Sequence, residues 1–208
     1  MSGPSDLDAL TDELRRRHGL HTLLLYGSHA RGDETPESDV DVAGFAEVGA
    51  TIRDARLWCG TYLDAFVYPT AVLETTPDAE LLKLVGARVL LDERGLAQPL
   101  LDRIAELERR GPPALTADDA QMRRVWAHKM LARIRRGDLE ARYRHHWLLY
   151  QLLEDHFALR GVWYRGPKEA LASLARDAPA TFAAFERALG VDESLAGLAA
   201  LVELVVNA

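Results

Sequence analysis

The spacing of hydrophobic positions changes near residue 110. In the first part, Leu7, Leu10 and Leu14 recur with the period of a helix, which predicts a helix over residues 6–18 ending at Gly19. Apolar runs predict a buried strand over 21–26 and two strands within 53–68 around a turn near Cys59-Gly60. A helix over 77–85, a short strand over 88–91 and a helix over 96–109 complete this part.

Beyond residue 110 the pattern is wholly helical. The stretch Arg110-Gly111-Pro112-Pro113 interrupts all periodicity and predicts a domain boundary. Five helices are expected after it, over residues 117–136, 138–159, 168–176, 179–189 and 194–206. The sequence therefore predicts an α+β chain, with a first domain of strands and flanking helices at 1–110 and an all-helical bundle at 111–208.

The most informative stretch is residues 23–42, LLLYGSHARGDETPESDVDV. Gly27-Ser28 ends the buried strand, residues 28–31 form one turn of helix, and residues 38–42 form the next strand. Alternation along that strand places Asp39 and Asp41 on one face, where their negative charges repel each other. A divalent cation between them relieves this repulsion, and Mg²⁺ typically takes one or two carboxylates together with phosphate oxygens. Gly27 allows close approach of a ligand, and the N–H groups after it favour an anion.

These residues resemble the signature of the DNA polymerase β-like nucleotidyltransferases. Ten residues separate Gly27-Ser28 from Asp39-x-Asp41, and the Ala-Arg-Gly after the serine is similar to small bacterial members. The alternative is an acidic hairpin at the surface. The resemblance is specific over residues 20–68 and concerns only architecture afterwards, where aminoglycoside and lincosamide nucleotidyltransferases likewise join this domain to a helical one.

The resemblance implies a site and a reaction. Asp64, on a neighbouring strand, matches the third carboxylate of the family, the alternative being an exposed strand residue. Asp39, Asp41 and Asp64 are then expected to be catalytic and to hold two Mg²⁺ ions. Gly27, Ser28 and Arg31 are expected to bind the triphosphate of ATP or another nucleotide. A nucleoside monophosphate passes to a hydroxyl group, and pyrophosphate leaves.

Charge and composition limit the partners. Residues 1–110 carry 12 basic and 20 acidic side chains, against 13 and 12 in residues 111–208, which argues against a long nucleic acid at the acidic half. The single cysteine, Cys59, excludes an internal disulfide and fits a reducing cytoplasm. The sequence shows no signal region and no apolar run of membrane-spanning length, so we expect a soluble cytoplasmic protein without membrane contact.

The helical half offers further candidates, each with a structural alternative. Tyr143, Trp147, Tyr150 and Glu154 share one face of a helix and line either a substrate pocket or the bundle core. Lys168 follows Gly-Pro in the first turn of a helix, where a cation opposes the helix dipole, which suggests contact with the nucleotide. Eight basic residues within 22 positions bind triphosphate or RNA, or form a solvated face: Arg123, Arg124, Lys129, Arg133, Arg135, Arg136, Arg142 and Arg144.

The acceptor is the open question. The first expectation is a small hydroxyl compound, with Glu154 or Glu140 as candidate base. A second is a helical partner protein that receives the nucleotide, as in toxin–antitoxin pairs. A third, of another class, is RNA binding or ribonuclease activity, because Arg123 and His128 match an Arg-x4-His spacing. The resemblance also leaves a homodimer open.

Overall fold

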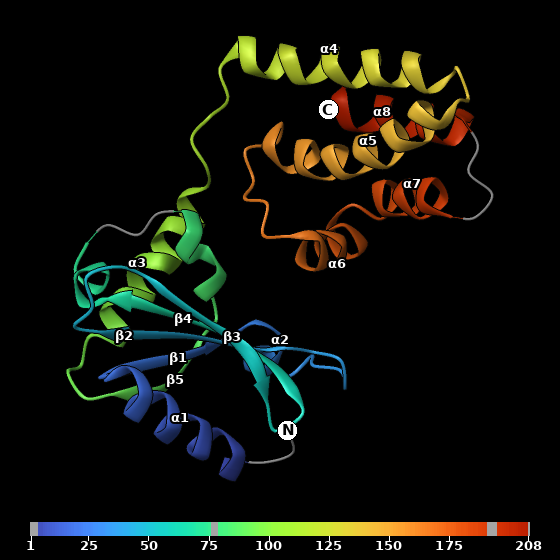
Figure 1. The fold of residues 1–208 in the computed structure, drawn as a ribbon. Coiled ribbons are helices and arrows are strands. Elements are labelled where there is room, and N and C mark those ends of the chain that lie inside the picture. The colour runs from blue at the N-terminus through green and yellow to red at the C-terminus, as the bar shows by residue number, and fades with distance from the viewer. Residues whose placement is uncertain (1–3, 76–78, 191–194, 208) are drawn as a thin grey trace. The chain divides into compact units, whose positions relative to one another are not determined.

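A mixed five-stranded sheet forms the centre of the first part of the chain (Figure 1). The computed structural model describes residues 4–75, 79–190 and 195–207. The strands lie in the order β3-β4-β2-β1-β5, and only the β2–β4 pair is parallel. They are β1 (Thr22–Tyr26), β2 (Val40–Ala46), β3 (Ile52–Trp58), β4 (Thr61–Pro69) and β5 (Arg88–Asp92). The expected strands are present, although β2 begins two residues later than predicted and extends to Ala46. The α+β class is confirmed.

Helices cover both faces of this sheet (Figure 1). They are α1 (Pro4–His18), α2 (Gly27–Arg31) and α3 (Ala97–Arg110), together with the 3₁₀ segments η1 (Thr70–Leu73) and η2 (Ala79–Leu84). Alternation along β1 sends Leu23 and Leu25 to the α1 face and Leu24 to the α3 face. The helix expected over 77–85 is a 3₁₀ segment from Ala79, and its predicted start at Pro77 lies outside the described residues.

Polar side chains attach α1 to β3. The Arg56 guanidinium donates a hydrogen bond to Glu13, and the indole N–H of Trp58 donates to the same carboxylate at 2.7 Å. These contacts lower the pKa of Glu13, chiefly through the bond from Trp58. A single carboxylate on α1 therefore holds two side chains of the edge strand.

The turn between β3 and β4 is the tight hairpin that the sequence predicts. Gly60 has a φ of 83°, and Cys59, with a φ of 49°, is the one described residue other than glycine that has a positive φ. Cys59 is exposed at this turn and forms no disulfide.

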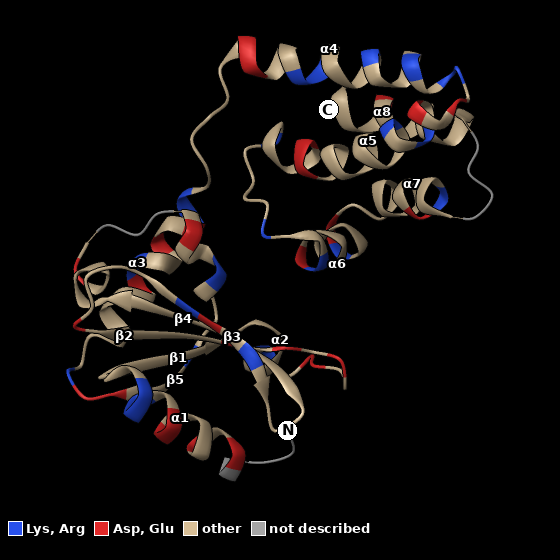
Figure 2. Ribbon diagram, viewed as in Figure 1, with Lys and Arg blue, Asp and Glu red and all other residues tan. Residues whose placement is uncertain are grey.

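Within the described residues of the second part, five helices are present, as expected. They are α4 (Ala117–Ile134), α5 (Leu139–Ala158), α6 (Pro167–Asp177), α7 (Pro179–Leu189) and α8 (Leu195–Val206). Thr116 and Asp138 cap α4 and α5 by accepting hydrogen bonds from backbone N–H groups. The predicted first residue of the last helix, Ser194, lies outside the described residues. The ribbon of α4 is coloured for acidic residues where the helix begins and for basic residues further along it (Figure 2).

The helices enclose a core of their own, separate from the two layers around the sheet. By its contacts the chain divides into two units, Met1–Arg110 and Gly111–Ala208. His156 is buried in the second unit and packs edge-on against Phe157. Burial lowers the pKa of His156 to about 4, with a smaller contribution from the charge of Arg160. None of the helices in the described part of the chain is both long and apolar enough to cross a membrane.

Candidate active site

The site in the first unit is built on a contact between Gly27 and Asp41. Gly27 begins α2 directly after β1 and has a φ of 70°. A Cβ atom at this position would lie 2.3 Å from Oδ2 of Asp41. Only glycine therefore fits, both because of its backbone conformation and because a carboxylate occupies the space of a side chain. The two halves of the sequence signature meet at this point.

Three predicted aspartates lie together at this end of the sheet. Asp41 is paired in register with Asp64 across the parallel strands β2 and β4, and Asp39 stands immediately before β2. Asp41 is half-buried while Asp39 is exposed. Burial, together with smaller contributions from the negative charges of Asp39 and Asp64, raises the pKa of Asp41 to about 6. The chain thus keeps a carboxylate in surroundings that disfavour its ionised form.

Asp64 is engaged by a cation of the protein. Nε of Arg53 donates to Oδ1 of Asp64 at 2.8 Å, and a second guanidinium nitrogen donates to Oδ2 at 2.9 Å. Sequence reasoning missed Arg53, because its partner is set by the β3–β4 register. Over the described residues, no group of three or more Asp, Glu, His or Cys side chains is arranged to hold a metal ion. The assignment of all three aspartates to metal therefore stays a prediction.

Lys83 is a second cation that the sequence did not reveal. It comes from η2 and lies over aromatic rings, with Nζ 3.5 Å from the centroid of Phe66 and 5.3 Å from that of Tyr26. Burial lowers the pKa of Lys83, whereas the negative charges of Asp64 and Asp41 oppose that change. The sequence feature that points to Lys83 is its position as a single lysine within the apolar run of residues 81–85.

The remaining predicted residues of the first unit lie in or beside α2. Ser28 is buried, and Arg31 forms an ion pair with Asp33 at 3.4 Å. The charge of Arg31 acts to lower the pKa of Asp41. The ring atom Nε2 of His29 is buried without a hydrogen-bond partner in the described structure. Gly27, Ser28, Arg31, Asp39, Asp41 and Asp64 are thus brought together in one unit.

The donor set at this place fits a hard divalent cation. Asp39 and Asp41 offer carboxylate oxygens, which Mg²⁺ prefers, and their mutual repulsion is relieved by positive charge. Lys83 and Arg31 supply part of that charge in the protein itself.

The predicted residues on α5 do not belong to the bundle core. Tyr143, Trp147 and Tyr150 are 70%, 47% and 59% exposed. The alternative that this face forms the core is therefore wrong, because α5 buries its opposite side through Leu148 and Leu152. Glu154 raises the pKa of Tyr150 by its charge and by a hydrogen bond. Lys168 is exposed in the first turn of α6, in the second unit.

Four of the eight basic residues between positions 123 and 144 form bonds within the second unit. Arg123 is ion-paired with Asp155, and Arg124 donates to the backbone oxygen of Val206. Arg144 and Arg136 bond to Glu140 and lower its pKa, which opposes a role of Glu140 as base. His128 lies 3.7 Å from Glu203, so the two residues of the Arg-x4-His spacing face different partners.

Comparison with known proteins agrees with this geometry. Residues 7–90 match the family model of the nucleotidyltransferase domain. Among solved structures, a nucleotidyltransferase-like protein from Exiguobacterium sibiricum is similar over 97% of this chain and 73% of its own, with 12% identity and a TM-score of 0.44. That similarity is too weak to bear on function. No curated protein matches the sequence. The matched segment contains strands β1 to β4 and the Gly27–Asp41 contact, so residues 7–90 of this chain form a nucleotidyltransferase domain.

Proposed function

We propose that this enzyme transfers AMP from ATP to a hydroxyl group of a small molecule and releases pyrophosphate. The observation that supports it most directly is the contact of Gly27 with Asp41, with Asp64 next to Asp41 in the sheet register. The backbone at Gly27, which phosphates can approach closely, and the carboxylates therefore lie at the same end of the sheet.

In this proposal, the first turn of α2 binds the β- and γ-phosphates. The N–H groups that begin a helix have no partner within it, so those after Gly27 and Ser28 are available to phosphate oxygens. Arg31 neutralises part of the phosphate charge. These interactions hold the α-phosphorus in line for attack, and such positioning supplies much of the catalytic gain in phosphoryl transfer.

Asp39 and Asp41, with Asp64, are the residues that would hold Mg²⁺, two ions being expected. When bound, the metal supplies positive charge to the triphosphate and lowers the pKa of the acceptor hydroxyl. The acceptor hydroxyl attacks the α-phosphorus, its proton is lost, and the bond to pyrophosphate breaks.

A small acceptor is favoured over nucleic acid by charge. The first unit carries an excess of eight negative charges, which opposes a polyanion. The different partners of Arg123 and His128 remove the support for a ribonuclease site.

The test is calorimetric titration of a non-hydrolysable ATP analogue, with Mg²⁺ and with EDTA. Wild type is expected to bind only with Mg²⁺, and Asp41→Asn to lose this binding. Glu37→Gln, which removes an exposed charge in the same loop, is the matched control and should bind as wild type does. Equal binding with EDTA, or by Asp41→Asn, would contradict the proposal. Incubation with labelled ATP then distinguishes a small acceptor from a co-purifying protein that gains the mass of AMP.

A further inference from the structure

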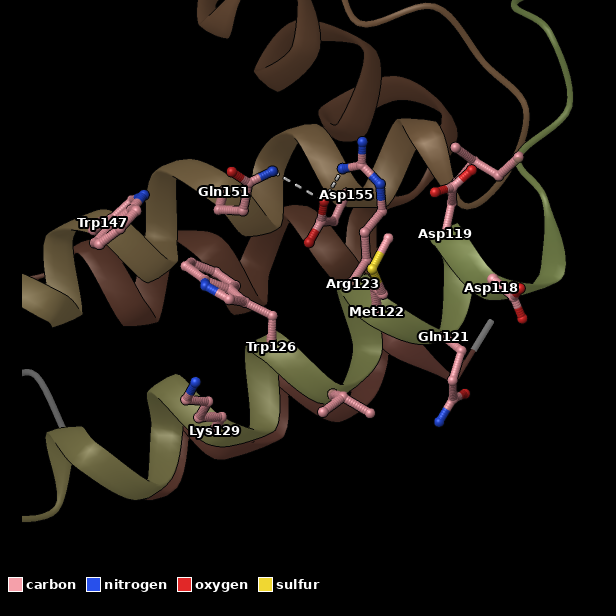
Figure 3. Close-up of a pocket in the computed structure, with 12 residues that line it drawn as sticks. Asp118, Asp119, Gln121, Met122, Arg123, Trp126, Lys129, Trp147, Gln151 and Asp155 are labelled. Atoms are coloured by element: carbon pink, nitrogen blue, oxygen red, sulfur yellow. Dashed lines mark hydrogen bonds and ion pairs between the residues drawn. The ribbon is translucent and has the colours of Figure 1, made fainter.

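A pocket of about 1010 Å³ lies in the second unit, between the first half of α4 and the second half of α5 (Figure 3). Its volume is at the upper end of the range for sites that bind small organic molecules. Every residue that lines it falls between Leu115 and Asp155, so the pocket belongs to the helical unit alone. It is distinct from the carboxylate site of the first unit.

One wall of this pocket is aromatic and apolar. The rings of Trp126 and Trp147 meet edge to face, with centroids 5.5 Å apart. Met122 and Val125 line the same pocket and are 63% and 54% exposed. Apolar side chains that gather in a hollow at the surface are typical of a ligand site. This wall accommodates a flat ring.

A buried carboxylate also lines the pocket. Asp155 is completely buried, and its Oδ1 accepts hydrogen bonds from Arg123 and, at 3.0 Å, from Gln151 (Figure 3). Its other oxygen, Oδ2, is buried without a hydrogen-bond partner in the described structure. A carboxylate oxygen in this condition has lost its hydration without replacement, which is costly. A hydrogen-bond donor on a ligand would give this oxygen the partner that it lacks.

The side chain that pairs with Asp155 also lines the pocket and is partly exposed. Arg123 reaches from α4 to the carboxylate, and about 35% of its side chain is exposed. A ligand that carries its own cation can take the place of the guanidinium at Asp155 while Arg123 turns toward solvent.

The charges around the pocket favour a cation as well. Three carboxylates line it, those of Asp118, Asp119 and Asp155, against two cations, Arg123 and Lys129. The faces of the two tryptophans add attraction for positive charge, since cations are drawn to aromatic rings. An anionic ligand is disfavoured by the same excess of carboxylates.

We propose that this pocket binds a small aromatic molecule bearing an amine, with its ring against Trp126 and Trp147 and its N–H donors directed to Asp155. The site stands independently of AMP transfer, because it rests only on residues of the helical unit.

The experiment uses the full chain labelled with ¹⁵N and two probes with the same ring. Naphthylethylamine carries an ammonium group, and naphthylacetate carries a carboxylate. The amine is expected to shift the indole N–H signals of Trp126 and Trp147 while leaving that of Trp58, in the first unit, unchanged. Naphthylacetate should bind at least about tenfold more weakly. Equal affinity for both probes, or unchanged signals of Trp126 and Trp147, would overturn the proposal.

Two variants locate the binding. Trp147→Ala removes a half-exposed wall and should weaken the amine at least about tenfold without unfolding the bundle. Arg123→Met combined with Asp155→Leu replaces the buried ion pair by apolar groups, a change that proteins commonly tolerate, and should abolish the preference for the amine. Tyr143→Ala, on the same helix but outside the pocket, is the control. A preference for the amine that survives in the double variant would show that Asp155 is not the recognition group.

Discussion

At the scale of single residues, the site depends on the absence of one methyl group. We predict that Gly27→Ala lowers kcat/KM by at least about a hundredfold, because the added Cβ displaces the Asp41 carboxylate. Steady-state kinetics with labelled ATP measures the effect, and circular dichroism checks that the fold is retained.

Gly32→Ala is a close control for that substitution. Gly32 has a similar φ of 76°, yet nothing lies within 4 Å of a Cβ built there. Both variants strain the backbone alike, and only the first touches the site. Similar losses of activity in the two variants would mean that backbone strain, and not the carboxylate contact, is responsible.

The ionised Asp41 carboxylate is expected to destabilise the folded protein. Its pKa is raised from 3.8 to about 6 in the folded protein, so the folded state binds more protons than the unfolded chain between these values. Stability from this group is therefore present at low pH and is lost as the pH rises through about 6. Asp41→Asn should stabilise the metal-free protein at pH 8 by about 1 to 2 kcal/mol, after allowance for solvent screening. Urea unfolding at pH 8 and pH 5 tests this, and a destabilised variant at pH 8 would contradict it.

At the scale of elements, the attachment of α1 to β3 depends on Glu13. Glu13→Ala removes the acceptor of both Arg56 and Trp58, and we expect a loss of about 1 to 2 kcal/mol in the free energy of unfolding. Asp12→Ala, an exposed neighbour on the same helix, is the control and should change stability by less than about 0.5 kcal/mol in urea unfolding.

What the sequence predicts well at this scale is what depends on local pattern. The alternation of β4 places Asp64 on the face opposite Leu63 and Ala65, and both apolar residues are buried as expected. The bonds of Asp64 to Arg53 and the position of Lys83 over Phe66 depend on register and on packing between segments distant in sequence. The sequence around these residues does not indicate which partners they contact.

The sequence pattern likewise does not predict which face of α5 is exposed. This helix is apolar on more than one side, so its period does not decide which side is covered. Packing against α4 and α8 buries Leu148 and Leu152 and leaves Tyr143 and Tyr150 exposed. The sequence identifies the residues that share this face, and packing against the neighbouring helices decides that the face is exposed.

At the scale of the whole molecule, the second unit is expected to lose stability in acid. The folded pKa of His156 lies near 4, below its ordinary 6.5, so the unfolded chain binds more protons between these values. Stability from this group is present above pH 6.5 and falls as the pH drops toward 4, by up to about 3 kcal/mol. Thermal unfolding followed by circular dichroism at pH 7 and pH 4.5 measures the change. His156→Leu should reduce this pH dependence, and an unchanged dependence would exclude His156 as its source.

Each unit has its own core, which predicts independent folding. Fragments 1–110 and 111–208 are expected to unfold cooperatively when expressed separately, each with dispersed amide NMR signals. A fragment that stays disordered would show that its core needs the other unit.

The exposed Cys59 at the β3–β4 turn has a practical consequence. Because it is the chain's single thiol, a nitroxide spin label attached there reports from one known point without any mutation. Paramagnetic broadening of amide signals in residues 111–208, recorded before and after nucleotide is added, would then measure whether any residue of the helical unit comes within range of this turn.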